Sequence, residues 1–142
     1  MKGALFDTSI YVDSLRRGDD AVLTLRRVNA ESPLWVSAVV LEELYAGAGD
    51  RAHRAVQRLE REFEGIGRIL VPNLKDWSDA GTLLARFAAK HGYEQVGRGR
   101  LTNDALIATS ASRLGILVIT AKDRDFRRMA EFLSFQWQLA SL

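Results

Sequence analysis

The sequence contains no cysteine. This absence excludes disulfides, thiolate metal sites and cysteine nucleophiles, and it is the usage expected in a reducing cytosol. Apolar runs are also too short to span a bilayer, and Asp7 interrupts the segment in which a secretion signal would still be apolar. We therefore expect a cytoplasmic protein that has no membrane segment.

The chain also has little net charge, +2 at pH 7, although its basic residues are mostly arginine. Many of these arginines stand in short groups: Arg16-Arg17, Arg26-Arg27, Arg98-Gly99-Arg100, and Arg124 with Arg127-Arg128. The planar guanidinium matches phosphate oxygens better than an ammonium does. Any one group is most simply a solvated helix face, but together with the acids described below they favour a polyanionic partner.

Length and patterning predict one compact α/β domain over residues 1–142. Short apolar runs predict strands at residues 3–6, 34–36, 69–71, 116–119 and 135–139. Between them, helical patterns cover residues 8–15, 21–28, 37–46, 52–63, 77–91 and 104–114, and a last helix begins at residue 126. This alternation predicts a central, mostly parallel sheet of about five strands flanked by helices, with the functional site at the carboxyl ends of the strands.

Acidic residues follow several of these strands. Asp7 comes directly after the first strand, and Asp123 and Asp125 follow the fourth. Others belong to helices: Glu42 and Glu43 after the second strand, and Asp104 in the first turn of its helix. If they converge, at least four carboxylates repel one another unless a hard cation neutralises them, which points to Mg²⁺ or Mn²⁺ and to phosphodiester hydrolysis.

Each acid also has a simpler explanation. Asp7 could cap the helix that follows it, and Asp104 is favourable at a helix N-terminus whatever its function. One of Glu42 and Glu43 is expected to be solvated, and Asp123 and Asp125 could be ordinary loop acids. The metal-site hypothesis depends on their coincidence at strand ends.

Four segments, in order and over nearly the whole chain, carry a family resemblance. They are Leu5-Phe6-Asp7-Thr8-Ser9, Val36-Ser37-Ala38-Val39-Val40-Leu41-Glu42-Glu43-Leu44, Leu101-Thr102-Asn103-Asp104-Ala105-Leu106-Ile107-Ala108, and Val118-Ile119-Thr120 with Asp125-Phe126. In these segments the sequence resembles the PIN-domain ribonucleases, in particular the VapC-type toxins of toxin–antitoxin pairs. The resemblance implies a PIN-like three-layer sandwich and an Mg²⁺-dependent endoribonuclease, with Mn²⁺ able to substitute.

The resemblance also implies a role for each acid. Asp7, Glu43 and Asp104 correspond to the core acids, with Glu43 preferred because it directly precedes the leucine of a Glu-Leu pattern. Asp125 keeps the Asp-Phe register of the fourth acid, and Asp123 is its alternative. Asp7 and Asp104 are expected to bind the metal directly, while Glu43 and Asp125 hold its waters.

Neighbouring residues complete the implied site. Thr8 and Thr120 resemble hydroxyls that orient the carboxylates or a metal-bound water. Lys122 stands where the family commonly has asparagine, and it would bring a positive charge close to the metal. Arg98 and Arg100, in the loop before Asp104, are candidates for contacting the RNA backbone.

The family resemblance implies two protein partners, a small antitoxin and a second copy of the chain. The antitoxin tail is expected to lie across the arginine-lined groove. Homodimerisation could use the apolar stripes of residues 22–28 and 56–63.

Two other functions remain open at this point. A receiver-like signalling domain would also use an acidic pocket, a threonine such as Thr120 and a lysine such as Lys122, but its phospho-accepting aspartate would follow a central strand in mid-chain, where this sequence has Pro72-Asn73. A non-catalytic PIN-like module that binds RNA or protein would keep the acids while Lys122 disables the metal site.

Overall fold

The computed structural model describes residues 3–17, 30–97 and 101–140. Its sheet has five parallel strands in the order β3-β2-β1-β4-β5. The strands are β1 Ala4–Phe6, β2 Leu34–Ser37, β3 Ile69–Leu70, β4 Leu117–Thr120 and β5 Trp137–Leu139. The helices are α1 Thr8–Arg17, α3 Ala38–Gly65, α4 Leu74–His91, α5 Tyr93–Gly97, α6 Leu101–Leu114 and α7 Arg124–Met129.

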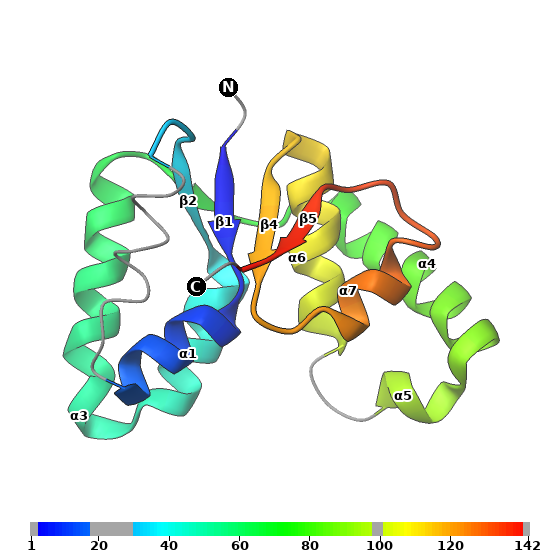
Figure 1. The fold of residues 1–142 in the computed structure, drawn as a ribbon, viewed down its shortest axis with the longest axis horizontal. Helices are drawn as coiled ribbons and strands as arrows, with labels where there is room; N and C mark the ends of the chain where they lie inside the picture. The colour runs from blue at the N-terminus through cyan, green and yellow to red at the C-terminus, as the bar shows by residue number, and fades with distance from the viewer. Residues whose placement is uncertain (1–2, 18–29, 98–100, 141–142) are drawn as a thin grey trace.

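The expected three-layer α/β sandwich is confirmed. Helices α1 and α3 pack together on one side of the sheet, while α4, α6 and α7 form a second group on the other side (Figure 1). Burial on both faces explains the apolar strands: all of β1 is buried, and Val118 and Ile119 of β4 have no exposed surface.

The pairing of the central strands positions the site. Phe6 of β1 lies in register with Ile119 of β4, and the backbone N–H of Asp7 donates to the carbonyl of Ile119 at 2.8 Å. Because both strands run in the same direction, Asp7 and Thr120 leave the sheet side by side at its carboxyl edge. Two residues 113 positions apart thereby become neighbours.

Helix α3 is bent sharply at Gly49, where the sequence predicts a break between two helices. Gly49 has φ 62° and ψ −176°, a conformation that only glycine adopts readily. The hydroxyl of Tyr45 donates to Glu60 Oε1 at 2.5 Å, although residues 15 apart in a straight helix would be separated by about 22 Å. The two parts of α3 therefore fold back on each other, and the two-helix expectation is physically correct.

Helices α4 and α6 are joined by an ion pair that the sequence pattern did not reveal. Asp76, which is 1% exposed, accepts hydrogen bonds from Arg113 at 2.9–3.0 Å. The same carboxylate accepts the backbone N–H of Asn73, whose side chain accepts the N–H of Asp76 in a capping box. Asp76 therefore fixes the start of α4 against the end of α6.

Several expectations about individual elements are wrong. The helix expected from residue 104 begins at Leu101, which is buried, so Thr102 and Asn103 lie inside its first turn. The helical pattern that begins at Trp77 predicts an apolar face that includes this residue, but Trp77 is 55% exposed. By contrast, the expectation of a mostly parallel sheet is confirmed, because all five strands in the described residues run parallel. The helix predicted at residues 21–28 lies outside the described residues.

No helix in the described residues combines the length and the apolar character needed to cross a bilayer.

Candidate active site

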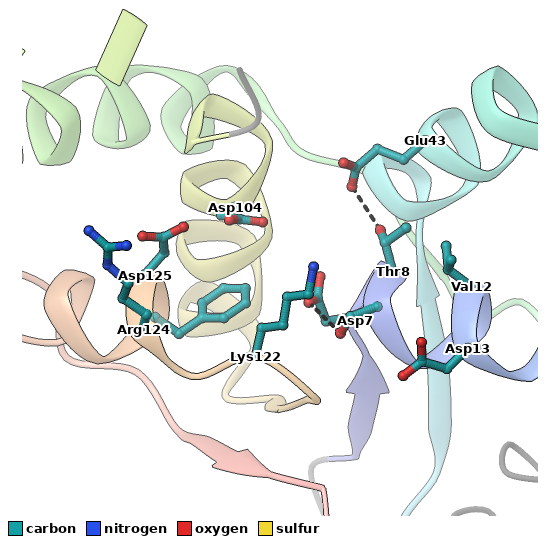
Figure 2. Close-up of a pocket in the computed structure, with 11 residues that line it drawn as sticks. Asp7, Thr8, Val12, Asp13, Glu43, Asp104, Lys122, Arg124 and Asp125 are labelled. Atoms are coloured by element: carbon teal, nitrogen blue, oxygen red, sulfur yellow. Dashed lines mark hydrogen bonds between the residues drawn. The ribbon is translucent and has the colours of Figure 1, made fainter. Parts of the chain in front are cut away.

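The acids selected from the sequence line one pocket at the carboxyl edge of the sheet. Asp7, Glu43, Asp104 and Asp125 all border a cavity of about 380 Å³ (Figure 2). The described residues that complete its lining are Thr8, Ser9, Val12, Asp13, Lys122, Arg124 and Phe126. Segments from every part of the chain thus contribute carboxylates to a single space.

Each of these four acids is delivered by a different element. Asp7 follows β1 directly, and Glu43 lies in the second turn of α3. Asp104 and Asp125 lie in the first turns of α6 and α7. The helix macrodipole stabilises an acid in the first turn, so Asp104 and Asp125 are favoured by their helices at the same positions where they line the pocket.

Asp7 is the most enclosed of these acids, at 7% exposure. Its Oδ2 accepts hydrogen bonds from the hydroxyls of Thr120 at 3.0 Å and Ser9 at 3.1 Å. Two hydroxyls on one oxygen hold the carboxylate in a single orientation toward the pocket. This is the type of contact that the sequence analysis expected of Thr120.

Ser9 was not selected from the sequence as a site residue. Its hydroxyl donates to Asp7 and also accepts the backbone N–H of Ala121 at 3.2 Å, linking the acid to the loop after β4. Asp13 was missed as well. It lies four residues after Ser9 on α1, a spacing that places both side chains on one helix face and was a usable signal.

Glu43 and Glu42 differ in burial and in contacts. Glu43 is half-buried at the pocket and accepts a hydrogen bond from the Thr8 hydroxyl at 2.7 Å (Figure 2), whereas Glu42 is exposed. Thr8 has the composition of a helix cap. It begins the helix instead, and its hydroxyl is engaged with Glu43.

Asp123 and Asp125 also differ in position. Asp123 occupies the N-cap position of α7 and accepts a hydrogen bond from Arg127 at 2.5 Å, on the exposed side of the helix. Asp125 lines the pocket, and Asp123 is not among the described lining residues. The candidate RNA-binding residues Arg98 and Arg100 lie outside the described residues.

The family of the chain follows from a comparison with family models. Residues 4–132 match the model described as the PIN domain. The chain belongs to this family. The resemblance found in the four sequence segments is thereby confirmed for the PIN family, and the receiver-like alternative is wrong.

Solved structures have the same fold over almost the whole chain. DNA-bound VapBC from Salmonella typhimurium is 22% identical, with a TM-score of 0.70, covering 98% of this chain and 98% of that chain. VapBC2 from Rickettsia felis, bound to a DNA fragment from its promoter, is 22% identical with a TM-score of 0.68, covering 97% and 98%. VapBC-1 from nontypeable Haemophilus influenzae is 25% identical with a TM-score of 0.58, covering 95% and 96%. A comparison with curated proteins finds no match.

The donor chemistry of this PIN domain pocket fits a hard divalent cation. Its acids supply carboxylate oxygens, the ligands that Mg²⁺ prefers. Within the described ranges, no three acidic, histidine or cysteine side chains lie close enough together to hold an ion by themselves. Mg²⁺ commonly takes one or two carboxylates and completes its coordination shell with water and substrate phosphate. The pocket fits this kind of coordination and not a site in which protein side chains supply every ligand.

Proposed function

We propose that this protein is an Mg²⁺-dependent endoribonuclease, the toxin of a toxin–antitoxin pair. The observation that carries the proposal is the convergence of Asp7, Glu43, Asp104 and Asp125 on one pocket. Membership of the PIN family supports a nuclease, a hydrolase of phosphodiester bonds, at the level of class. The proposal extends to residues 1–142 as one domain, to Mn²⁺ as a substitute cation and to a cytoplasmic location, where RNA substrates are found.

The proposed roles extend the family resemblance to the acids that line the pocket. Asp7 and Asp104 would hold the ion, and Glu43 and Asp125 would hold its waters and help to activate the attacking water. When bound, the ion supplies charge neutralisation and polarises the phosphoryl oxygens. Thr120 and Ser9 orient Asp7, and Thr8 orients Glu43, through the hydrogen bonds described above.

Substitution of two metal-binding acids tests the enzymatic proposal. We expect Asp7→Asn and Asp104→Asn each to abolish Mg²⁺-dependent RNA cleavage, because an amide keeps the shape of the side chain but carries no charge to attract the ion. Cleavage of a mixed RNA pool is measured, with circular dichroism to show that the fold is retained.

Asp79→Asn is the matched control, since Asp79 lies on α4 and pairs only locally with Lys75. It should cleave like the unmodified chain. Full activity in both pocket variants would overturn the proposal. Sequencing RNA ends from cells that express the chain or its Asp7→Asn variant would identify the substrate.

Arg98 and Arg100 are proposed to contact the RNA backbone. Because phosphate contacts release counterions, we expect Arg98→Ala or Arg100→Ala to weaken RNA binding and reduce the slope of its salt dependence by about one. Arg68→Ala is the control, because Arg68 directly precedes β3 and so lies at the opposite, amino edge of the sheet. Binding isotherms at several salt concentrations give the slopes, and an unchanged slope would reject this role.

A small antitoxin is the proposed protein partner. The similar structures named above are VapBC structures, and their likeness to this chain supports the proposal. The antitoxin tail is proposed to cross the arginine-lined groove and to reduce RNA cleavage by blocking the acids.

A homodimer is also proposed. Val56 and Phe63 are each 1% exposed and pack in the core, so the stripe of residues 56–63 is used within the chain. Residues 22–28 lie outside the described residues. The apolar side chains Val71, Leu74 and Trp77, which are 62%, 82% and 55% exposed, supply a better candidate surface.

One observation favours a second function. Lys122 lines the same pocket as the acids, and an ammonium group there could replace the metal. The chain would then be a non-catalytic PIN-like module that binds RNA or protein. Absence of Mn²⁺ binding would support this second function over the first.

A further inference from the structure

Lys122 is attached to the same hydrogen-bond network as Asp7. The Thr120 hydroxyl lies 3.0 Å from Asp7 Oδ2 and 2.9 Å from the carbonyl of Lys122, and it accepts the backbone N–H of Lys122 at 3.0 Å. Ser9 ties the preceding residue, Ala121, to Asp7 in the same way. The backbone at position 122 is therefore fixed relative to the most enclosed acid of the pocket.

The side chain of Lys122 extends from this fixed backbone into the pocket. Figure 2 shows its nitrogen directed toward Asp7, whereas the guanidinium of Arg124 lies beyond Asp125. Lys122 is nevertheless exposed, so its ammonium group keeps contact with water and does not carry the cost of a buried charge.

The charges around this space are unequal. Among the described residues that line the pocket, the basic groups are Lys122 and Arg124. The carboxylates number five: Asp7, Asp13, Glu43, Asp104 and Asp125. One divalent ion leaves part of this negative charge uncompensated, and the approach of an RNA phosphate is then opposed. A further positive charge near Asp7 would lower that opposition.

We propose that Lys122 is the second cation of this pocket, a monovalent charge that lets the site operate with one divalent ion. The inference rests on the proposed function, because it assumes that the acids hold a metal. It is opposed to the second function proposed above, in which Lys122 disables the site, because here the ammonium group would act together with a bound ion and would not replace it. Its positive charge also faces an incoming phosphate.

Mn²⁺ binding, counted by electron paramagnetic resonance of the free ion, tests the inference without reference to catalysis. We expect one Mn²⁺ per unmodified chain. In Lys122→Gln, loss of a nearby positive charge should tighten the first ion roughly fivefold and allow a second ion to bind. Lys122→Arg restores the charge and should again bind one ion.

Lys75→Gln is the matched control, since it removes the same charge from an exposed site on α4 and should not alter Mn²⁺ binding. Two ions on the unmodified chain, no Mn²⁺ binding by it, or equal behaviour of Lys122→Gln and Lys75→Gln would overturn the inference. One ion on the unmodified chain with the expected change in Lys122→Gln supports it, even if RNA is not cleaved. In that case the proposed nuclease function fails while the charge role of Lys122 stands.

Discussion

Asp7 illustrates how much of this site depends on single hydroxyl groups. Its Oδ2 accepts from Ser9 and Thr120, which come from opposite ends of the chain. Each hydroxyl also contacts the backbone of the loop after β4, so the orientation of the acid and the path of that loop are coupled. Removing either hydroxyl should therefore affect stability and metal binding together.

Ser9→Ala is the direct test at this scale. The substitution leaves Asp7 with one hydroxyl donor and leaves the N–H of Ala121 without its acceptor, so we expect a loss of about 1 kcal/mol in the free energy of unfolding. Mn²⁺ affinity and RNA cleavage should fall as well. Denaturant titration and Mn²⁺ titration measure the two effects.

Ser78→Ala provides the comparison, because Ser78 is exposed on α4 and alanine is the better helix former there. Its stability should be equal or slightly higher. If Ser9→Ala matched Ser78→Ala in stability and in Mn²⁺ affinity, the bridging role of the Ser9 hydroxyl would be refuted.

At the scale of elements, the bend of α3 decides where Glu43 lies. The first part of the helix carries Glu43 to the pocket, and the second part returns past Tyr45 to bury Val56 and Phe63. The pKa of the Tyr45 hydroxyl is raised by its hydrogen bond to Glu60, so the stability that this bond contributes is complete below the ordinary pKa of tyrosine and is lost only as pH rises through the raised pKa. The bend itself requires the backbone conformation of Gly49.

Gly49→Ala should destabilise the protein. Any other residue at φ 62° and ψ −176° is strained, which costs about 1–3 kcal/mol in the free energy of unfolding. Gly47→Ala tests the same chemistry in helical backbone two residues earlier, where an added Cβ meets nothing within 4 Å. It should stabilise by about 0.5–1 kcal/mol. Thermal and denaturant unfolding of both variants would measure the contrast, and equal effects would contradict it.

The sequence predicted this break because two glycines interrupt the apolar periodicity at that point. The predicted start of α6 at residue 104 is wrong. Thr102 and Asn103 have the composition of capping residues, which favours a helix that begins after them. Burial of Leu101 in the core extends the helix past them, so packing outweighs the local preference.

For the whole molecule, the exposed apolar side chains at the end of β3 and the start of α4 predict how the chain assembles. Leu74 and Trp77 are three residues apart on α4 and share a face. If this surface forms the homodimer, the double variant Leu74→Ser with Trp77→Ser should be monomeric. Sedimentation velocity at several concentrations measures the change.

Tyr93→Ser, at a position 76% exposed on α5, is the control and should remain a dimer. A dimer that persists in the double variant would place the interface elsewhere on the molecule. RNA cleavage by the monomeric variant would further show whether one chain holds a complete site.

The sequence by itself determined the alternation of strands and helices, the acids that follow the strands and the glycine break in α3, because periodicity and backbone conformation are local properties. Only the tertiary structure decided which of these acids share a pocket. The order of the strands brings Asp7 beside Thr120, and the start of α7 directs Asp125 inward and leaves Asp123 on the exposed side. It also brought in Ser9 and Asp13, because the neighbours of a side chain depend on how segments pack together and not on their distance along the chain.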